Sequence, residues 1–511
     1  MNILLINVPS RKGIGGFVLP FGLLYVGTII EKSGHRAKII DPYLDDLELK
    51  DFDHDNFDKI DAIIEDYKPT IIGYGGIATS YGRTKRLSIH IKNNYPKITQ
   101  IAGGPLASVY DLLLTKTKVD VVFHGEAEVS LPIFLESFEQ KEPIYNILGI
   151  SFLQNGKVVR NKLAEQIKDL DSISLPAYHL IDLYKYLIPV KRWLDAYKIQ
   201  LNSNPHYSDL LKTIGRRTHT IPIVASRGCT HKCSFCYRHV RGIRRHSVTY
   251  VINHIKYLKE TYGINGFGFS DELFNSSYEW VMEFCDAIEK KDLNIFYMVG
   301  GARADKIDEK MLCRLRETGC IDINYGQESG SDVILKEYRK GIKSQRNKEI
   351  TLLTKAVGIN CPVQLVIGSP GETTRTIFET IQFLKDVKAY HFSLNYLIAL
   401  PETPIWQYVK KNELVQDVEQ YLDLVAKYGG APLLNLTKEP NKVWKFWGRL
   451  IHKELKLYYY KKTKPKTFYF YALLFSFLYS FVNTIEFLVP SRIKPLVPRS
   501  VKNVVVKLLR M

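Results

Sequence analysis

Short apolar runs alternate with longer stretches of periodic apolar and polar positions in the first part of the chain. Uninterrupted apolar runs are typical of strands buried on both faces of a sheet, and the periodic stretches are typical of helices. Strands separated by helices of this length predict a parallel, doubly wound sheet. The predicted strands are Ile3–Val8, Ala37–Ile40, Thr70–Gly73, Ile98–Ile101 and Val119–Phe123, and the predicted helices are Phe21–Ser33, Arg83–Asn94 and Glu128–Phe138.

A second series of strands and helices begins at Ile221, after a predicted hairpin over Ser151–Val159 with Asn155-Gly156 as its turn. Six repeated strand–helix units predict a partial parallel barrel, in which chemistry lies at the carboxyl ends of the strands. The predicted strands are Ile221–Ala225, Gly266–Phe269, Ile295–Val299, Ile321–Tyr325, Val363–Ile367 and Phe392–Ile398, and the helices between them include Tyr250–Thr261, Glu279–Glu289, Glu309–Glu317 and Thr374–Val387.

The chain is therefore expected to be an α/β protein of several domains, since 511 residues exceed one ordinary core. A composition of 45% hydrophobic and 24% charged residues fits a folded globular protein. We expect a doubly wound, Rossmann-like sheet over residues 1–145 and a linker over 146–220. A partial (β/α)6 barrel is expected over 221–410, followed by a basic and hydrophobic helical region over 411–511.

Three of the seven cysteines lie within eight residues, directly after the first predicted barrel strand. Cys229, Cys233 and Cys236 can place three thiolates around a four-iron cluster from one loop. Three protein ligands leave one iron of the cluster without a protein ligand. A cluster that donates an electron to a molecule and also binds that molecule needs such an open iron. The alternatives are a zinc site completed by His239 and a chance grouping of buried thiols. Thiolate ligands must stay reduced, which predicts a cytoplasmic location.

Glycine is frequent at the predicted strand ends of the first sheet. Gly73–Gly76, Gly103–Pro105 and Gly125-Glu126 each follow a strand. Ligands of doubly wound sheets bind at this edge, and glycine lets the backbone approach a large flat ligand closely. Plain turns are the alternative for these glycines.

The cysteine loop resembles the signature of the radical S-adenosylmethionine (SAM) superfamily, including the aromatic Phe235 before the last cysteine. The resemblance implies that the open iron chelates the amino and carboxylate groups of SAM, whose reduction releases a 5′-deoxyadenosyl radical. It also implies SAM contacts at the ends of the following strands, because the family places its polar residues there. These expected contacts are Phe235, Asp271, Glu272, Arg303, Glu328, Ser329, Gly368 and Gly371.

The first domain is similar to the cobalamin-binding domain that is fused to many radical SAM enzymes. The similarity is carried by Pro20–Gly27, Ile101–Pro105 and Val119–Glu128. The Asp-x-His-x-x-Gly motif of other cobalamin domains is missing from Ser10–Pro20, so no histidine of that loop is expected as a lower axial ligand. The expected cobalamin contacts are Gly22, Thr79, Ser80, Gly103, Gly104, Gly125 and Glu126.

Most of the net charge of +18 belongs to the C-terminal region. From Lys438 onward, the sequence contains sixteen basic residues and only three acidic ones. Thr467–Ile485 is nineteen residues without charge, just long enough to span a bilayer, and basic residues flank both of its ends. A span would export one flank, so attachment to the membrane surface is favoured over a span or an aromatic core helix. The basic and aromatic run Lys442–Trp447 could meet RNA, but no RNA-binding module accompanies it, and no nucleic-acid partner is expected.

The two resemblances together imply a radical SAM enzyme that uses a 4Fe–4S cluster, SAM and cobalamin. The leading hypothesis is methylation of an unactivated carbon of a small-molecule or lipid substrate, with cobalamin as methyl carrier. Flavodoxin or ferredoxin would supply electrons, at the inner face of the cell membrane if the C-terminal region binds it. The alternatives are radical cyclisation, rearrangement or carbon–carbon coupling on the same cofactors, and a non-catalytic, membrane-associated protein that binds cobalamin or a metal.

Overall fold

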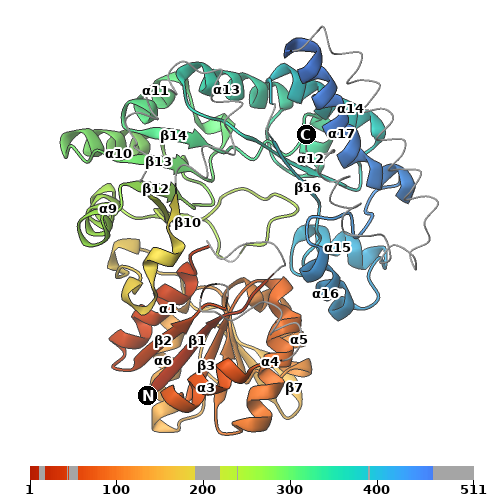
Figure 1. Cartoon of the computed structure of the whole chain (residues 1–511). Coiled ribbons are helices and arrows are strands. Elements are labelled where there is room, and N and C mark those ends of the chain that lie inside the picture. Colours follow the sequence, from red (N-terminus) through yellow and green to blue (C-terminus); the bar gives the residue numbers. More distant parts are fainter. Residues whose placement is uncertain are drawn as a thin grey trace.

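The computed structural model describes residues 1–10, 18–42, 44, 56–189, 219–238, 240–389 and 392–463. Two α/β units follow one another along the chain. Of the helices that come after the second unit, the last packs on that unit and the one before it packs on the first unit (Figure 1). Within the described residues, no helix is both long enough and apolar enough to cross a bilayer.

The first unit contains a seven-stranded sheet in the order β2-β1-β3-β4-β5-β6-β7. The first five strands are parallel, whereas β6 and β7 form an antiparallel hairpin at the edge. The strands are β1 Asn2–Asn7, β2 Arg36–Ile40, β3 Ile71–Gly75, β4 Thr99–Ala102, β5 Val121–Phe123, β6 Ile150–Gln154 and β7 Lys157–Arg160. The predicted hairpin is confirmed, and it extends this sheet past the expected domain boundary at residue 145.

Helices cover both faces of this sheet, as the doubly wound fold requires. Alternate side chains of β1 enter opposite cores: Ile3 packs with α1 and α6, whereas Leu4 packs with α3, α4 and α5. The helices are α1 Phe21–Lys32, α3 Asp58–Tyr67, α4 Tyr81–Asn94, α5 Tyr110–Lys116 and α6 Ala127–Gln140. Short 3₁₀ turns, η1 Ala78–Ser80 and η2 Gly104–Val109, follow β3 and β4.

The second unit is a partial barrel of six parallel strands. β14, β13, β12 and β9 form one sheet, with the short β8 Ile188–Pro189 antiparallel at its edge. β15 and β16 pair with each other and join β14 through isolated bridges, Asp322 to Asn360 and Glu328 to Leu365. The parallel strands are β9 His219–Ile223, β12 Gly266–Phe269, β13 Phe296–Val299, β14 Cys320–Ile323, β15 Val363–Ile367 and β16 Phe392–Tyr396.

Helices surround the outer face of the barrel. They are α9 Val248–Tyr262, α10 Tyr278–Lys290, α11 Glu309–Glu317, α12 Asp332–Glu337, α13 Ser344–Val357 and α14 Thr374–Asp386. α15 Pro404–Lys411, α16 Val418–Tyr428 and α17 Asn441–Thr463 complete the described chain. α16 contacts α4 of the first unit, and α17 packs on α14 (Figure 1).

The segment between the units is described up to Pro189. It contains the 3₁₀ turns η3 Leu170–Ser172, η4 Tyr178–Leu180 and η5 Leu183–Tyr186. Tyr178 is buried and donates to or accepts from His254 of α9 at 2.9 Å. This linker therefore packs against both units.

Candidate active site

A two-stranded antiparallel ribbon closes the base of the cysteine loop. β10 Ser226–Gly228 leads into Cys229, and β11 Ile243–Arg245 receives the chain at the other end of the loop. Gly228 has φ +87°, and a Cβ there would collide with the carbonyl oxygen of Gly242. The ribbon can close only with glycine at this position, because an L side chain is disfavoured at such φ.

The three cysteines lie on this one loop, as the sequence predicted. The Cys236 amide donates to the Cys233 carbonyl at 3.4 Å, and the His231 amide donates to the Cys229 sulfur at 3.5 Å. The hydrogen bond between the Cys233 and Cys236 thiols lowers the pKa of Cys233 to about 6 and raises that of Cys236. Burial raises the pKa of Cys229.

The chemistry of the donors fits an iron–sulfur cluster, because thiolates are its usual protein ligands. Among the described residues, no three His, Cys, Asp or Glu side chains are close enough to hold one metal ion together. A cubane differs from such a site, since each thiolate binds a separate iron. His239, the fourth ligand of the zinc alternative, lies outside the described residues.

Charged side chains from three barrel strand ends lie near these thiols. Arg303, after β13, forms a bidentate pair with Asp305 at 2.7 and 3.0 Å. Glu328, after β14, pairs with Lys340 at 3.4 Å, and both side chains are about nine-tenths buried. Burial is the main reason that the pKa of Glu272 is raised. The expected SAM contacts Glu272, Arg303 and Glu328 are thus brought to one end of the barrel.

Lys340 is a member of this cluster that the sequence analysis missed. It follows α12, and its charge acts on Cys233 and Cys236. In the sequence, its only distinguishing feature is that it directly precedes Gly341, which has φ +65° and ends the turn after α12. Nothing local distinguishes it from a surface lysine.

Three more of the expected SAM contacts, from the cysteine loop and two barrel strand ends, also have partners within the protein. Asp271 accepts from the Ala225 amide at 3.1 Å and the Ser226 hydroxyl at 2.5 Å, and burial raises its pKa to about 6. Ser329 is buried against the Thr380 hydroxyl at 3.1 Å. Phe235 packs edge-on against Tyr338, with ring centres 5.1 Å apart. Asp271 and Phe235 therefore fix the two ends of the cysteine segment.

The turn after β15 contains buried polar atoms without partners in the described structure. Gly368 has φ +100°, and its amide donates to the Glu372 carboxylate. The other Glu372 oxygen, the Ser369 hydroxyl and the Trp444 indole nitrogen have no hydrogen-bond partner. Burial raises the pKa of Glu372 to about 8. These unpaired groups fit the expectation that this turn, with Gly368 and Gly371, meets a polar ligand.

The carboxyl edge of the first sheet fits cobalamin in a similar way. The Thr79 hydroxyl is buried and has no partner in the described structure, whereas the Ser80 hydroxyl donates to the Val8 carbonyl at 3.0 Å. Gly103 and Gly104 follow β4, and Gly104 has φ +67°. Thr79 thus remains available for a ligand, while Ser80 fixes η1 to β1.

The remaining expected cobalamin contacts lie at the start of two helices. Gly22 is in the first turn of α1, and Gly125, with φ +73°, precedes α6; an added Cβ would meet nothing within 4 Å at either glycine. Glu126 is the N-cap residue of α6, and both of its carboxylate oxygens are bonded by Arg227 and Arg244 of the ribbon. The loop expected to meet cobalamin therefore contacts the base of the cysteine loop.

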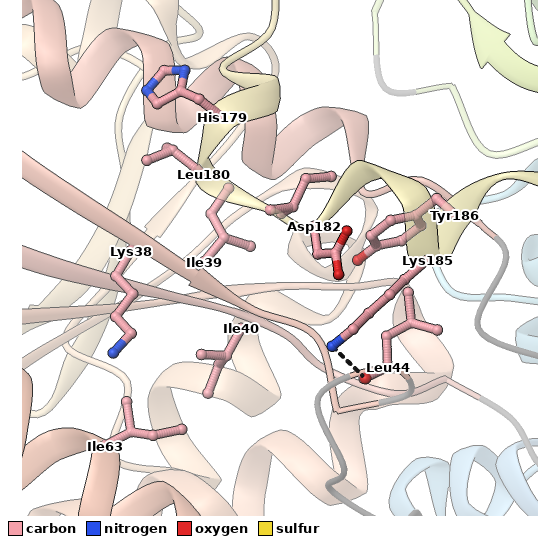
Figure 2. Close-up of a pocket in the computed structure, with 11 residues that line it drawn as sticks. Lys38, Ile39, Ile40, Leu44, Ile63, His179, Leu180, Asp182, Lys185 and Tyr186 are labelled. Carbon is pink, nitrogen blue, oxygen red and sulfur yellow. Dashed lines mark hydrogen bonds between the residues drawn. The ribbon is translucent and has the colours of Figure 1, made fainter. Parts of the chain in front are cut away.

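A cavity of about 320 Å³ lies between the linker and the last residues of β2, the outer strand of the first sheet (Figure 2). Its polar groups have protein partners: Lys185 donates to the Leu44 carbonyl at 3.2 Å, and Tyr186 donates to Asp41 at 2.7 Å. His179 pairs with Glu31 at 3.0 Å. These contacts give no reason to assign a ligand to this cavity.

Two family sequence profiles match the chain. The Radical SAM superfamily matches residues 223–384, and the B12 binding domain matches residues 12–135. The chain is 26% identical to an uncharacterized methyltransferase of Pyrococcus horikoshii, over 81% of this chain and 84% of the relative. It is 25% identical to the anaerobic magnesium-protoporphyrin IX monomethyl ester cyclase of Synechocystis, over 70% and 66%. It is 23% identical to the cytidylyl-2-hydroxyethylphosphonate methyltransferase of Streptomyces wedmorensis, over 72% and 73%.

Solved structures share the fold of most of the chain. The radical SAM methyltransferase TsrM of Kitasatospora setae superposes with a TM-score of 0.62 at 16% identity, over 81% of this chain and 77% of TsrM. The cobalamin-dependent radical SAM enzyme OxsB superposes with a TM-score of 0.66 at 16% identity, over 94% and 72%.

The barrel with its cysteine loop makes this protein a radical SAM enzyme. With the B12-binding domain before the barrel, it belongs to the cobalamin-dependent radical SAM enzymes. The cofactors of this class are a 4Fe–4S cluster, SAM and cobalamin. The family resemblance, the fold class and the cofactors expected from the sequence are therefore confirmed.

Proposed function

We propose that the enzyme transfers a methyl group from SAM to an unactivated carbon of a small-molecule substrate. The observation that carries the proposal is the direct contact between the two cofactor regions. The base of the cysteine loop, at Arg227, touches the strand-end loop of the B12-binding domain, at Glu126. Relatives named as methyltransferases, in Pyrococcus horikoshii and Streptomyces wedmorensis, support methyl transfer over other radical chemistry.

The cofactors, when bound, supply one-electron reduction of SAM and a carrier for its methyl group. We assign Cys229, Cys233 and Cys236 to the cluster. Glu272 would accept from the ammonium of SAM, because a carboxylate beside the cysteine loop is a suitable partner for a cation. Arg303 and Lys340 would oppose the negative charge of the thiolates and of the SAM carboxylate.

The test is product analysis with SAM labelled in its methyl group, using anaerobically reconstituted enzyme and a small-molecule extract. We expect S-adenosylhomocysteine and 5′-deoxyadenosine to form together, with label in the product. Cys233→Ala should abolish 5′-deoxyadenosine formation, whereas Cys313→Ala, outside the loop, should leave it intact. Formation of 5′-deoxyadenosine without S-adenosylhomocysteine or labelled product would exclude methyl transfer.

A second candidate function is radical cyclisation on the same cofactors. It is supported by the similarity to the magnesium-protoporphyrin IX monomethyl ester cyclases of Synechocystis and Rubrivivax gelatinosus. This candidate predicts 5′-deoxyadenosine and an unlabelled product of changed ring structure. The same labelled reaction therefore separates the two functions.

Attachment to a membrane surface, and with it a lipid substrate, is a finer proposal that rests on sequence alone. The uncharged segment Thr467–Ile485 lies outside the described residues, and of its basic flanks only Lys461 and Lys462, in the last turn of α17, are described. We expect the full chain to float with anionic vesicles and Leu474→Asp to float less, because the charge opposes burial of the segment. A full chain that does not float at low salt would remove this proposal.

A further inference from the structure

Two arginines lie opposite each other on the ribbon at the base of the cysteine loop. Arg227 of β10 pairs in register with Arg244 of β11. Like charges directly opposite on two strands repel, so the ribbon needs negative charge beside it. That charge comes from the first unit, more than 90 residues earlier in the chain, as Glu126 and Glu128.

The contacts between these four residues are close and mostly buried. Arg244 forms two parallel bonds to the Glu126 carboxylate, each of 2.8 Å. Arg227 lies 3.1 Å from the same carboxylate and 2.7 Å from Glu128. Burial opposes the charge of Glu126, yet the bonds from Arg244 and Arg227 hold its pKa below the ordinary value. The Tyr25 ring of α1 covers Arg227 at 4.8 Å.

These contacts join the two places where the cofactors are expected. On the barrel side, only Gly228 separates Arg227 from Cys229. On the other side, Glu126 follows Gly125 in the loop between β5 and α6. One carboxylate thus fixes the base of the cluster loop to the loop of the B12-binding domain.

We propose that Arg227, Arg244 and Glu126, the interdomain ion cluster, hold the iron–sulfur cluster and the cobalamin at a fixed spacing and orientation. Units within one chain move relative to each other where contacts do not hold them, and at the two cofactor loops these contacts are ion pairs. A planar guanidinium bonded through two nitrogens accepts only one orientation of the carboxylate, so this pair resists rotation as well as separation. The three residues are positioning residues, since they act through the loops to which they belong.

The geometry matters because group transfer is sensitive to small displacements. A misplacement of about 1 Å can lower a rate about 100-fold. Loss of the ion cluster would therefore impair turnover, but activity alone would not separate lost spacing from lost cofactor. The distance between the cofactors is the direct readout.

Pulsed electron paramagnetic resonance on the loaded holoenzyme measures this distance, because the reduced cluster and cob(II)alamin are both paramagnetic. The experiment compares the wild type with Glu126→Gln and Arg244→Lys, after iron and cobalt content have been measured. Arg244→Lys keeps the charge and removes only the fork of two donors. We expect one narrow distance distribution in the wild type and a broadened or shifted one in both variants.

The chain offers a matched control in a second ion pair between the same two units. Arg160 of β7 lies 3.0 Å from Glu402, but both side chains are about one-third exposed. Exposed pairs are screened and loosely held. Glu402→Gln should therefore leave the distance distribution unchanged.

Three results would overturn the proposal. The first is a wild-type distribution in Glu126→Gln and Arg244→Lys. The second is a distance distribution in Glu402→Gln that is broadened as much as in the other variants, because any ion pair between the units would then have the same effect. The third is a Glu126→Gln protein with full iron content and no bound cobalt, which would make Glu126 a cobalamin contact. Should Glu126→Gln fail to fold, Arg244→Lys against Glu402→Gln decides the question, and no substrate is needed for any of these measurements.

Discussion

The carboxyl of Glu372 is fully enclosed, and its ionisation must therefore cost stability. One oxygen accepts from the Gly368 and Ser369 amides, and the other has no partner in the described structure. Burial raises its pKa to about 8, against about 4.3 in an unfolded chain. Between these values the folded protein binds the extra proton, so this group lowers the free energy of unfolding as pH rises.

We predict that Glu372→Gln removes this pH dependence. The contribution of neutral Glu372 to the free energy of unfolding is fully present below about pH 4.3. It decreases by about 1.4 kcal/mol per pH unit as the pH rises to 8. The difference between variant and wild type should therefore grow in favour of the variant between pH 6 and pH 8. Anaerobic urea unfolding at both pH values measures it, and a constant difference would contradict the prediction.

A second prediction concerns the two glycines at the base of the cysteine loop. Gly228→Ala should lose iron, because its Cβ would collide with the Gly242 carbonyl and force the ribbon apart. Gly242→Ala is the matched control, since it also has positive φ, at +68°, but its Cβ meets nothing within 4 Å. We expect Gly242→Ala to cost about 1–2 kcal/mol and to keep its iron. Iron per chain and the thermal midpoint decide between them, and equal iron loss would contradict the argument.

At this scale the sequence predicted which residues gather, but not what each one bonds. Cys229, Cys233 and Cys236 could be found because their spacing is local. Asp271 stays an expected SAM contact, and its bonds to Ala225 and Ser226 could not be foreseen, because they depend on which donors the packing brings near. Lys340 was missed because its pairing with Glu328 depends on how the chain folds back after α12.

Among the elements, α17 differs most from its expected role. The run Lys442–Trp447 was considered for RNA and assigned to a basic region near a membrane. Trp444 and Trp447 are instead 1% exposed, in one core with β15, β16 and α14. The tryptophans lie three positions apart, on one face of the helix, and Lys445 between them is exposed.

We predict that Trp444→Ala destabilises the fold by about 3–5 kcal/mol, because it opens a large cavity against Tyr396 and Gly368. Lys445→Ala, on the exposed face of the same helix, should change stability by less than about 0.5 kcal/mol. Chemical unfolding measures both. A loss below about 1 kcal/mol in Trp444→Ala would show that α17 is not part of the core.

Strand positions were predictable within a few residues because the parallel strands are mainly apolar, although polar residues such as Lys38, Asp322 and Asn395 interrupt some of them. The first barrel strand ends at Ile223 rather than Ala225, since the Ala225 amide turns to Asp271. A helix is expected between the fourth and fifth barrel strands, but the sequence gives no bounds for it, and it is α13 Ser344–Val357. Its sequence is mostly polar, and its buried side includes Asn347, Thr351 and Thr354, so an apolar pattern could not show it.

For the whole molecule, the C-terminal helices bind the two units together. Leu422 of α16 is buried in the core of the first unit. Glu419 of the same helix pairs with Lys85 at 2.7 Å and accepts from the Tyr81 hydroxyl at 2.5 Å, both on α4. The chain thus returns to its first sheet after completing the barrel.

We predict that Leu422→Ala costs about 2–5 kcal/mol and lowers the unfolding temperature of the first unit, although it lies in the C-terminal part of the chain. Leu424→Ala is the matched control on the same helix, since Leu424 is 43% exposed. It should cost less than about 0.5 kcal/mol. Differential scanning calorimetry measures both, and equal shifts would mean that α16 does not share the first core.

The sequence by itself determined the two α/β units through their hydrophobic period and the grouping of the three cysteines through their local spacing. The cofactor class followed from the resemblance of both units to known families. Only the tertiary structure showed that Glu126 forms ion pairs with Arg227 and Arg244. It also showed that Trp444 is buried in the barrel core and Leu422 in the core of the first unit. Each of these contacts joins residues far apart in the chain. Their pairing follows from how the units pack, and no local pattern records that packing.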